Sequence, residues 1–157
     1  MSGAAHRPEY TLGRFIEAQR PIIDSVRTEL AAGHKRTHWM WFVFPQIRGL
    51  GHSPTAQNYA IDTLAQAEAY LRHPVLGARL RECTQLVCAS RQRTIEAIFG
   101  YPDNLKFHSC MTLFATAAGE RPEDRIFRAA LDKYFSGRED PRTLELLRPR
   151  GARPLDP

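Results

Sequence analysis

The stretch "LGRFIEAQRPIIDSVRTELAAG", residues 12–33, decides the fold class. Its large apolar residues return at intervals of three and four, which is the spacing of one helix face; they are Leu12, Phe15, Ile16, Ile23, Val26 and Leu30. Pro21 lacks a backbone N–H and should kink or divide this helix, and Gly33 is placed to end it. The same spacing recurs along most of the chain, whereas strand-like alternation is rare. The sequence therefore predicts an all-α protein.

Later segments carry further helix start signals. Ser53 followed by Pro54 is typical of an N-cap and a first helical residue, and it predicts a helix through "PTAQNYAIDTLAQAEAYLRH". Other expected starts and ends lie at Thr94, Asp103, Gly119, Pro122, Gly137 and Asp140. We expect about seven helices in one domain, residues 1–147, and a flexible C-terminal tail, 148–157. For Trp39–Phe44 alone, a short extended segment is the alternative to helix.

Composition indicates an ordinary globular chain. Its 157 residues are 43% apolar and 25% charged. The longest apolar run, 39–45, is far shorter than the ~20 residues that cross a bilayer, and residues 1–13 lack the apolar region of a secretory signal. We expect a cytoplasmic protein without a cofactor, whose Cys83, Cys88 and Cys110 are buried free thiols. The net charge of +5 is spread among interspersed acidic residues, so it only weakly favours anionic ligands.

An unusual mixture of side chains follows in "HWMWFVFPQIRGLGHSP", residues 38–54. Two tryptophans and two phenylalanines can anchor a core, because each buries about 150–250 Å². Core packing alone does not explain the polar residues that crowd around them. Convergent polar groups on an aromatic wall are typical of ligand sites. The stretch thus predicts one wall of a pocket, with the alternative that Trp41, Phe42 and Phe44 are core.

Three blocks of the chain resemble a known family. They are "HWMWFVFPQIRGLGHSPTAQNYAI", "EAYLRHPVLGARL" and "DNLKFHSCMTLF", and they are similar to the uncharacterised family called domain of unknown function 1810 from about Phe15 to about Leu147. The resemblance implies a compact, all-helical, soluble protein without an agreed activity. Some members carry the label calpastatin, yet calpastatin-type inhibitors are disordered polar chains, unlike this one. The family pattern has adjacent small hydroxyl residues where this chain has Ser109 and Cys110.

Two segments supply the candidate site residues. In "RGLGHSPT", residues 48–55, the helix start at Ser53 could bind an anion, with Arg48 as an added donor; an ordinary capped turn is the alternative. In "GYPDNLKFHS", residues 100–109, Asp103 should cap a helix whose first turns also carry Lys106 and Ser109. A carboxylate, an ammonium and a hydroxyl on one face can bind a polar ligand or order a catalytic water.

The leading hypothesis is a pocket for a nucleotide-like or sugar-phosphate-like small molecule. Trp39 and Trp41 would stack, Gln46 would read a polar edge, and His38 and Tyr59 would complete the wall. If the protein is an enzyme, hydrolysis or transfer at a glycosidic bond needs one carboxylate, and Asp103 with Lys106 would supply the catalytic groups. The arrangement is also faintly similar to the helical family that processes ADP-ribose derivatives, without matching motifs.

Other classes of function remain open. A nucleic-acid-binding module would use Lys35, Arg36, Arg48 and the arginine-rich tail, although proteins that bind nucleic acids more often show a concentrated basic stripe. A helical protein–protein interaction domain would place Trp39 or Trp41 on an exposed apolar patch. His34 and His38 share a helical spacing, but no carboxylate complements them, so no metal site is predicted.

Overall fold

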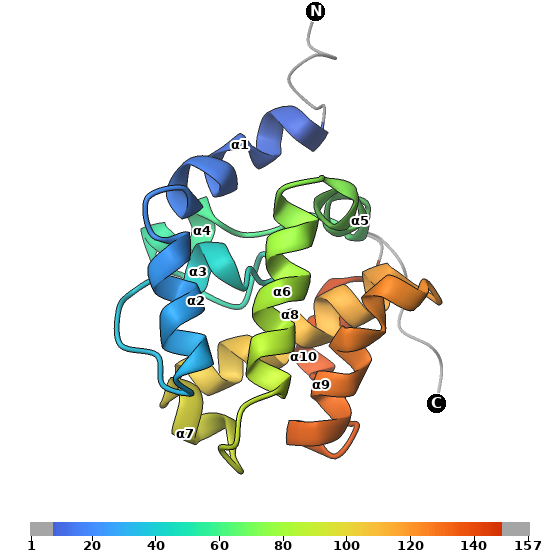
Figure 1. Ribbon diagram of the computed structural model, residues 1–157. Helices are drawn as coiled ribbons and strands as arrows, with labels where there is room; N and C mark the ends of the chain where they lie inside the picture. Colours follow the sequence, from blue (N-terminus) through green and yellow to red (C-terminus); the bar gives the residue numbers. More distant parts are fainter. Residues whose placement is uncertain (1–7, 149–157) are drawn as a thin grey trace, which may run out of the picture.

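The computed structural model describes the backbone of residues 8–148 and the side chains of residues 12–148. This part of the chain is helical, with a single isolated β-bridge between Ile47 and Ile61. Figure 1 shows the helices packed as one compact body. Their bounds are α1 Pro8–Gln19, α2 Ile23–Ala31, α3 Met40–Val43, α4 Pro54–Asn58, α5 Leu64–Arg72, α6 Leu76–Cys88, α7 Ile95–Phe99, α8 Asp103–Ala118, the 3-10 turn η2 Pro122–Asp124, α9 Arg125–Phe135 and α10 Pro141–Leu146.

The all-α prediction is confirmed, but the expected number of helices is too low. Ten α-helices lie within residues 8–148. The predicted long helix after Ser53 is wrong because it divides: α4 ends at Asn58, and α5 begins only at Leu64, where the Thr63 hydroxyl accepts from the Gln66 N–H. Between them Ile61 is extended and donates its N–H to the Gln46 carbonyl at 2.8 Å. A tertiary contact therefore outweighs the helical tendency of this segment.

The first two helices follow the sequence closely. The chain is interrupted at Pro21, between Gln19 and Ile23, as predicted. Gly33 follows the end of α2 with φ +76°, a conformation that glycine adopts without strain. The alternative of an extended segment near Trp39–Phe44 is wrong, because α3 occupies Met40–Val43. Two of its residues, Met40 and Val43, face the core, so one short turn buries both.

The centre of the molecule is α8. Helices α5, α7, α9 and α10 all pack against it, and Figure 1 shows it crossing behind α6. Its buried residues lie on every side of the helix, which is typical of a helix enclosed by others; they are Asn104, Phe107, Ser109, Cys110, Met111, Thr112, Leu113, Phe114 and Ala118. Because α8 is enclosed, polar side chains at its first turn are brought against the aromatic segment.

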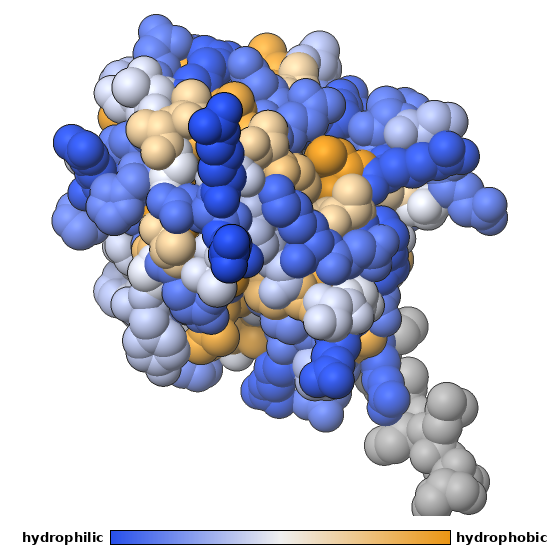
Figure 2. Space-filling model, turned by 60° about the horizontal axis from the view of Figure 1, so that its bottom comes forward, coloured by the Kyte–Doolittle hydropathy of each residue, from blue (hydrophilic) through white to orange (hydrophobic). Residues whose placement is uncertain are grey.

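The surface agrees with the interspersed charges. On the face drawn in Figure 2, hydrophilic side chains dominate and apolar areas are small and separated. No described helix has the length and apolar character needed to span a membrane. Cys83 and Cys110 are buried free thiols as predicted, whereas Cys88 is only partly buried. The predicted flexible tail lies, from residue 149 onward, outside the described residues.

Candidate functional site

The glycine loop is anchored by the β-bridge. The Gln46 carbonyl accepts from Ile61, and the Arg48 N–H donates to the Ile61 carbonyl, each at 2.8 Å. These two bonds fold residues 46–61 into a closed unit with α4 at its far end. Gly51 is needed here because a Cβ would lie 2.7 Å from the Cβ of Ala56. The loop therefore lies directly on α4.

A small hollow lies inside this unit. Three predicted ligand residues line it, Trp41, Gln46 and Tyr59, together with Ile47, Gly49, Gly51, Ala56 and Ala60. Its volume is about 10 Å³, which accommodates about one water molecule. Tyr59 is held there by Phe42, with ring centres 5.2 Å apart. The structure brings these three residues together, but the hollow is too small for a nucleotide.

Trp41 also borders an ion cluster. Nζ of Lys35 is 2.9 Å from Oδ2 of Asp103, and Nζ of Lys106 is 3.3 Å from Oδ1 of the same carboxylate. Nζ of Lys106 also lies 4.7 Å from the ring centre of Trp41. The first turn of α8 thus meets α3, although some sixty residues separate them in sequence. We call Lys35, Asp103, Lys106 and Trp41 the lysine cluster.

Asp103 does not have the capping role that its sequence position predicts. The N-cap position belongs to Pro102, and no side chain makes a capping bond at the start of α8. Both carboxylate oxygens of Asp103 instead contact ammonium groups. The ion pairs with two lysines compete successfully with the neutral backbone N–H groups, because charge-assisted bonds are stronger.

Trp39 is part of the core rather than a stacking surface. Its side chain is 1% exposed, and its ring packs against Phe44 and Phe99 at 6.2 and 6.4 Å between centres. The indole N–H donates to Oε1 of Glu29 at 3.0 Å. Nζ of Lys35 lies 5.1 Å from the same ring. Trp39 is therefore the buried ring on which Lys35 of the cluster packs, and Trp41 is the partly exposed indole of the pair.

Glu29 holds the loop that carries Lys35. Its Oε1 also accepts from the N–H groups of Arg36 (2.7 Å) and Thr37 (3.1 Å), and its Oε2 accepts from the Thr37 hydroxyl (2.6 Å). Burial by itself raises the pKa of this carboxyl, but these hydrogen bonds outweigh it and lower the pKa from 4.5 to about 2. The carboxylate stays ionised and fixes residues 35–39.

Three predicted ligand residues belong neither to the hollow nor to the lysine cluster. Ser53 caps α4 by accepting from the Ala56 N–H at 3.1 Å, and α4 has only five residues, so its dipole is short. Arg48 pairs with Asp62 at 2.5 Å on the exposed side of the loop. His38 is exposed next to Trp39. The capped-turn alternative thus describes Ser53 well.

Ser109 is directed away from the lysine cluster. It is 7% exposed, and its hydroxyl contacts Oδ2 of Asp140 at 3.0 Å and the Leu105 carbonyl at 3.1 Å. Asp140 in turn caps α10 by accepting from Thr143. Ser109 therefore ties α8 to α10, a structural contact that helical spacing alone did not reveal.

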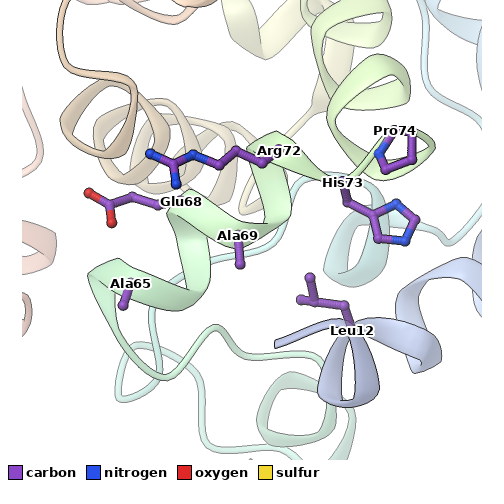
Figure 3. Close-up of a pocket in the computed structure, with 7 residues that line it drawn as sticks. All are labelled: Leu12, Ala65, Glu68, Ala69, Arg72, His73 and Pro74. Carbon is purple, nitrogen blue, oxygen red and sulfur yellow. The ribbon is translucent and has the colours of Figure 1, made fainter. Parts of the chain in front are cut away.

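A larger hollow of about 460 Å³ lies between α1 and α5. Figure 3 shows its lining, in which Glu68 and Arg72 project from the same side of α5. None of the residues predicted from sequence lines it. Among residues 12–148, no three His, Cys, Asp or Glu side chains are grouped so that they could hold a metal ion.

Sequence reasoning missed Glu29 as part of the site and named Lys35 only for the nucleic-acid alternative. Glu29 had a local signal, since it lies between Val26 and Leu30 on the apolar face of its helix. A charged residue in that position needs partners. Lys35 had no comparable signal, because its partner Asp103 is distant in the chain. Lysine is, however, rare here: residues 35, 106 and 133 are the only lysines among 22 basic residues.

Comparisons with known proteins agree with this fold. The model of the family described as "Protein of unknown function (DUF1810)" matches residues 9–147. The chain belongs to this family. It is also similar to the conserved hypothetical protein Rv1873 from Mycobacterium tuberculosis, whose crystal structure matches with 55% identity and a TM-score of 0.84, over 88% of this chain and 97% of that one. No curated protein matches the sequence.

Proposed function

We propose that this chain binds a small anionic molecule, nucleotide-like or sugar-phosphate-like, at the lysine cluster. One observation supports it above the others: Nζ of Lys106 lies between the Trp41 ring, 4.7 Å from its centre, and the Asp103 carboxylate at 3.3 Å. Cationic donors and an aromatic surface are thereby adjacent, and both are partly exposed. Nucleotides and sugar phosphates present an anion beside a ring, which suits such a surface.

The charges near the cluster favour an anion. Lys35, Arg36 and Lys106 are positive, Asp103 pairs with both lysines, and Glu29 already accepts hydrogen bonds from residues 36, 37 and 39. Partial exclusion of water strengthens such interactions. The side chains of Lys106 and Asp103 are 24% and 19% exposed, so a ligand can reach them.

The ring of the ligand would lie on the exposed part of Trp41. Stacking of a base on an aromatic side chain contributes about 1–3 kcal/mol. The hollow behind Trp41 accommodates about one water molecule in this structure, which would bridge the ligand to Gln46 or Tyr59. In this arrangement Gln46 reads a polar edge through water, and the glycine loop stays closed.

Catalysis at a glycosidic bond is the enzymatic form of this proposal. Both oxygens of Asp103 contact ammonium groups, so the carboxylate is better suited to stabilise a developing oxocarbenium ion than to accept a proton. Lys106 would neutralise a departing anionic group.

The nucleic-acid and protein-interaction alternatives stay predictions. Trp39 is interior and Trp41 lines a hollow, which is not the exposed apolar patch that protein docking requires.

Titration with ADP-ribose, NAD, nucleotides and sugar phosphates tests the proposal. Binding should appear in calorimetry and as a change in tryptophan fluorescence. Trp41→Phe should abolish the fluorescence change, because the buried Trp39 does not meet the ligand. Absence of heat and of any fluorescence change across the whole panel would refute binding at this site.

Matched charge variants separate the site from general electrostatics. Lys106→Gln should weaken binding by about tenfold or more, the effect of one lost charge-assisted contact. Arg128→Gln removes the same charge from α9, where Arg128 pairs with Glu139, and it should leave affinity unchanged. Equal effects of the two variants would indicate nonspecific attraction instead.

A further inference from the structure

We infer that the hollow between α1 and α5 binds a small zwitterion with an apolar side chain, the chemistry of a free amino acid such as leucine. The hollow has a volume of about 460 Å³, which lies within the ~300–1,000 Å³ of small-molecule sites. No residue of the lysine cluster lines it. This site is therefore separate from the one proposed above and does not depend on it.

Two opposite charges border the hollow without a partner. Glu68 and Arg72 lie four residues apart on α5, a spacing at which such side chains can pair along a helix. Within the described part of the chain, however, neither side chain makes an ion pair or a hydrogen bond. One carboxylate and one guanidinium are thus open to a ligand, which has no existing contact to break.

The neighbouring part of the lining is apolar and small. Ala65 and Ala69 project from α5 on the side that faces Leu12 of α1 (Figure 3). Single methyl groups leave space between the two helices, where longer side chains would fill it. Pro74 adds apolar surface just beyond the end of α5. An apolar ligand group placed here would lose its contact with water, which favours binding.

His73 gives the hollow a fixed end. Its Nδ1 accepts hydrogen bonds from the N–H groups of Val75 at 3.1 Å and of Leu76 at 3.3 Å. The neutral ring therefore carries its hydrogen on Nε2, and the two bonds hold its orientation. A wall that is already ordered loses little freedom when a ligand binds.

An α-amino acid matches this arrangement, because its ammonium and carboxylate groups are attached to one carbon atom. The ammonium would contact Glu68, and the carboxylate would contact the planar guanidinium of Arg72. The apolar side chain would then extend along Ala65 and Ala69. A simple anion is disfavoured by the charge of Glu68, and a simple cation is disfavoured by that of Arg72. The pair therefore selects a ligand that carries both charges.

Titration of the isotopically labelled full chain, followed by backbone amide NMR shifts, tests the inference. Leucine should bind with a Kd of ~1 mM or tighter, and the shifts should centre on residues 65–74. N-acetylleucine lacks the ammonium, leucinamide lacks the carboxylate, and glycine lacks the apolar side chain. Each should bind at least ~10-fold more weakly than leucine. Equal affinities of leucine and its two blocked forms, or no shifts up to ~10 mM leucine, overturn the inference.

Charge variants assign the two contacts. Glu68→Gln should weaken leucine binding about 10-fold but should not weaken N-acetylleucine binding, because that ligand has no ammonium. Arg72→Gln should likewise weaken leucine but not leucinamide. The matched control is Glu123→Gln, which removes an exposed carboxylate from η2 and should leave leucine binding unchanged. Equal losses for Glu68→Gln and Glu123→Gln, or for blocked and unblocked ligands, contradict the inference.

The location of the shifts separates this site from the lysine cluster. Lys106→Gln should leave leucine binding unchanged, because Lys106 does not line the hollow. If the shifts centre instead on residues 103–106 and Lys106→Gln removes them, the carboxylate of leucine binds at the lysine cluster. That result overturns the site between α1 and α5 while it supports the anion site of the proposed function.

Discussion

Substitution of Glu29 by glutamine tests a carboxyl group of α2 whose pKa is strongly lowered in the folded protein. Glu29 accepts hydrogen bonds from Arg36, Thr37 and Trp39, and its pKa falls from 4.5 to about 2. At about 1.4 kcal/mol per pH unit, the ionised carboxylate contributes on the order of 3 kcal/mol to the free energy of unfolding at neutral pH. Glutamine keeps one acceptor oxygen but not the charge, so Glu29→Gln should lose much of this stability.

The pH dependence follows from the sign of the shift. Because the folded pKa lies below the unfolded one, the stabilisation is complete above about pH 5 and is lost as the pH falls toward 2. The gap between the wild type and Glu29→Gln should therefore be about 3 kcal/mol at pH 7, about half of that at pH 3, and small near pH 2. Other carboxyl groups titrate in both proteins, so their contributions cancel in the difference.

Urea unfolding followed by circular dichroism, at several pH values from 7 to 2.5, measures this gap. Glu17→Gln serves as the control, because Glu17 is 70% exposed and, among the side chains of residues 12–148, pairs with Arg20 alone; its effect should stay within about 0.5 kcal/mol. A gap for Glu29→Gln that does not change with pH would refute the reasoning, since it would show that the charge of Glu29 adds nothing to folding.

Two further predictions concern the packing around α6. Gly77→Ala should destabilise the protein by about 1–3 kcal/mol or more, because a Cβ would lie 2.1 Å from the Leu71 carbonyl oxygen. Gly13→Ala is the control, because a Cβ there meets nothing within 4 Å, and it should not destabilise the protein. Equal urea midpoints for the two variants would contradict the prediction. In native protein at pH 8, a thiol reagent should modify Cys88 first, since burial raises the pKa of Cys83 to about 12 and that of Cys110 well above its usual value. In urea all three thiols should react equally fast. Equally rapid reaction of all three in the native protein would contradict the burial of Cys83 and Cys110.

The predicted fold was most accurate where the signal is local. The break at Pro21, the end of α2 before Gly33 and the caps at Ser53, Thr94 and Asp140 follow from single residues and their neighbours. Prediction failed where a distant contact decides the backbone. The segment between α4 and α5 is extended because Ile61 bonds to the Gln46 carbonyl, and no residue within the segment signals this.

The candidate site shows the same division. The sequence indicated which residues could carry chemistry, and Trp41, Gln46 and Tyr59 do line one hollow. It could not separate Trp39 from Trp41, because two indoles two positions apart have the same composition around them. In the structure one ring is interior and bonded to Glu29, whereas the other borders solvent beside Lys106.

The amino-acid sequence by itself determined the helical class, several helix ends and the family, because these depend on periodicity, on single turn residues and on long matching blocks. Only the tertiary structure decided that Lys35 and Lys106 share Asp103, that Ser109 of α8 bonds to Asp140 at the start of α10, and that Glu29 holds the lysine-bearing loop. The physical reason is that charge pairs depend on distance in space. Side chains separated by tens of residues have no periodic pattern that records which of them will meet.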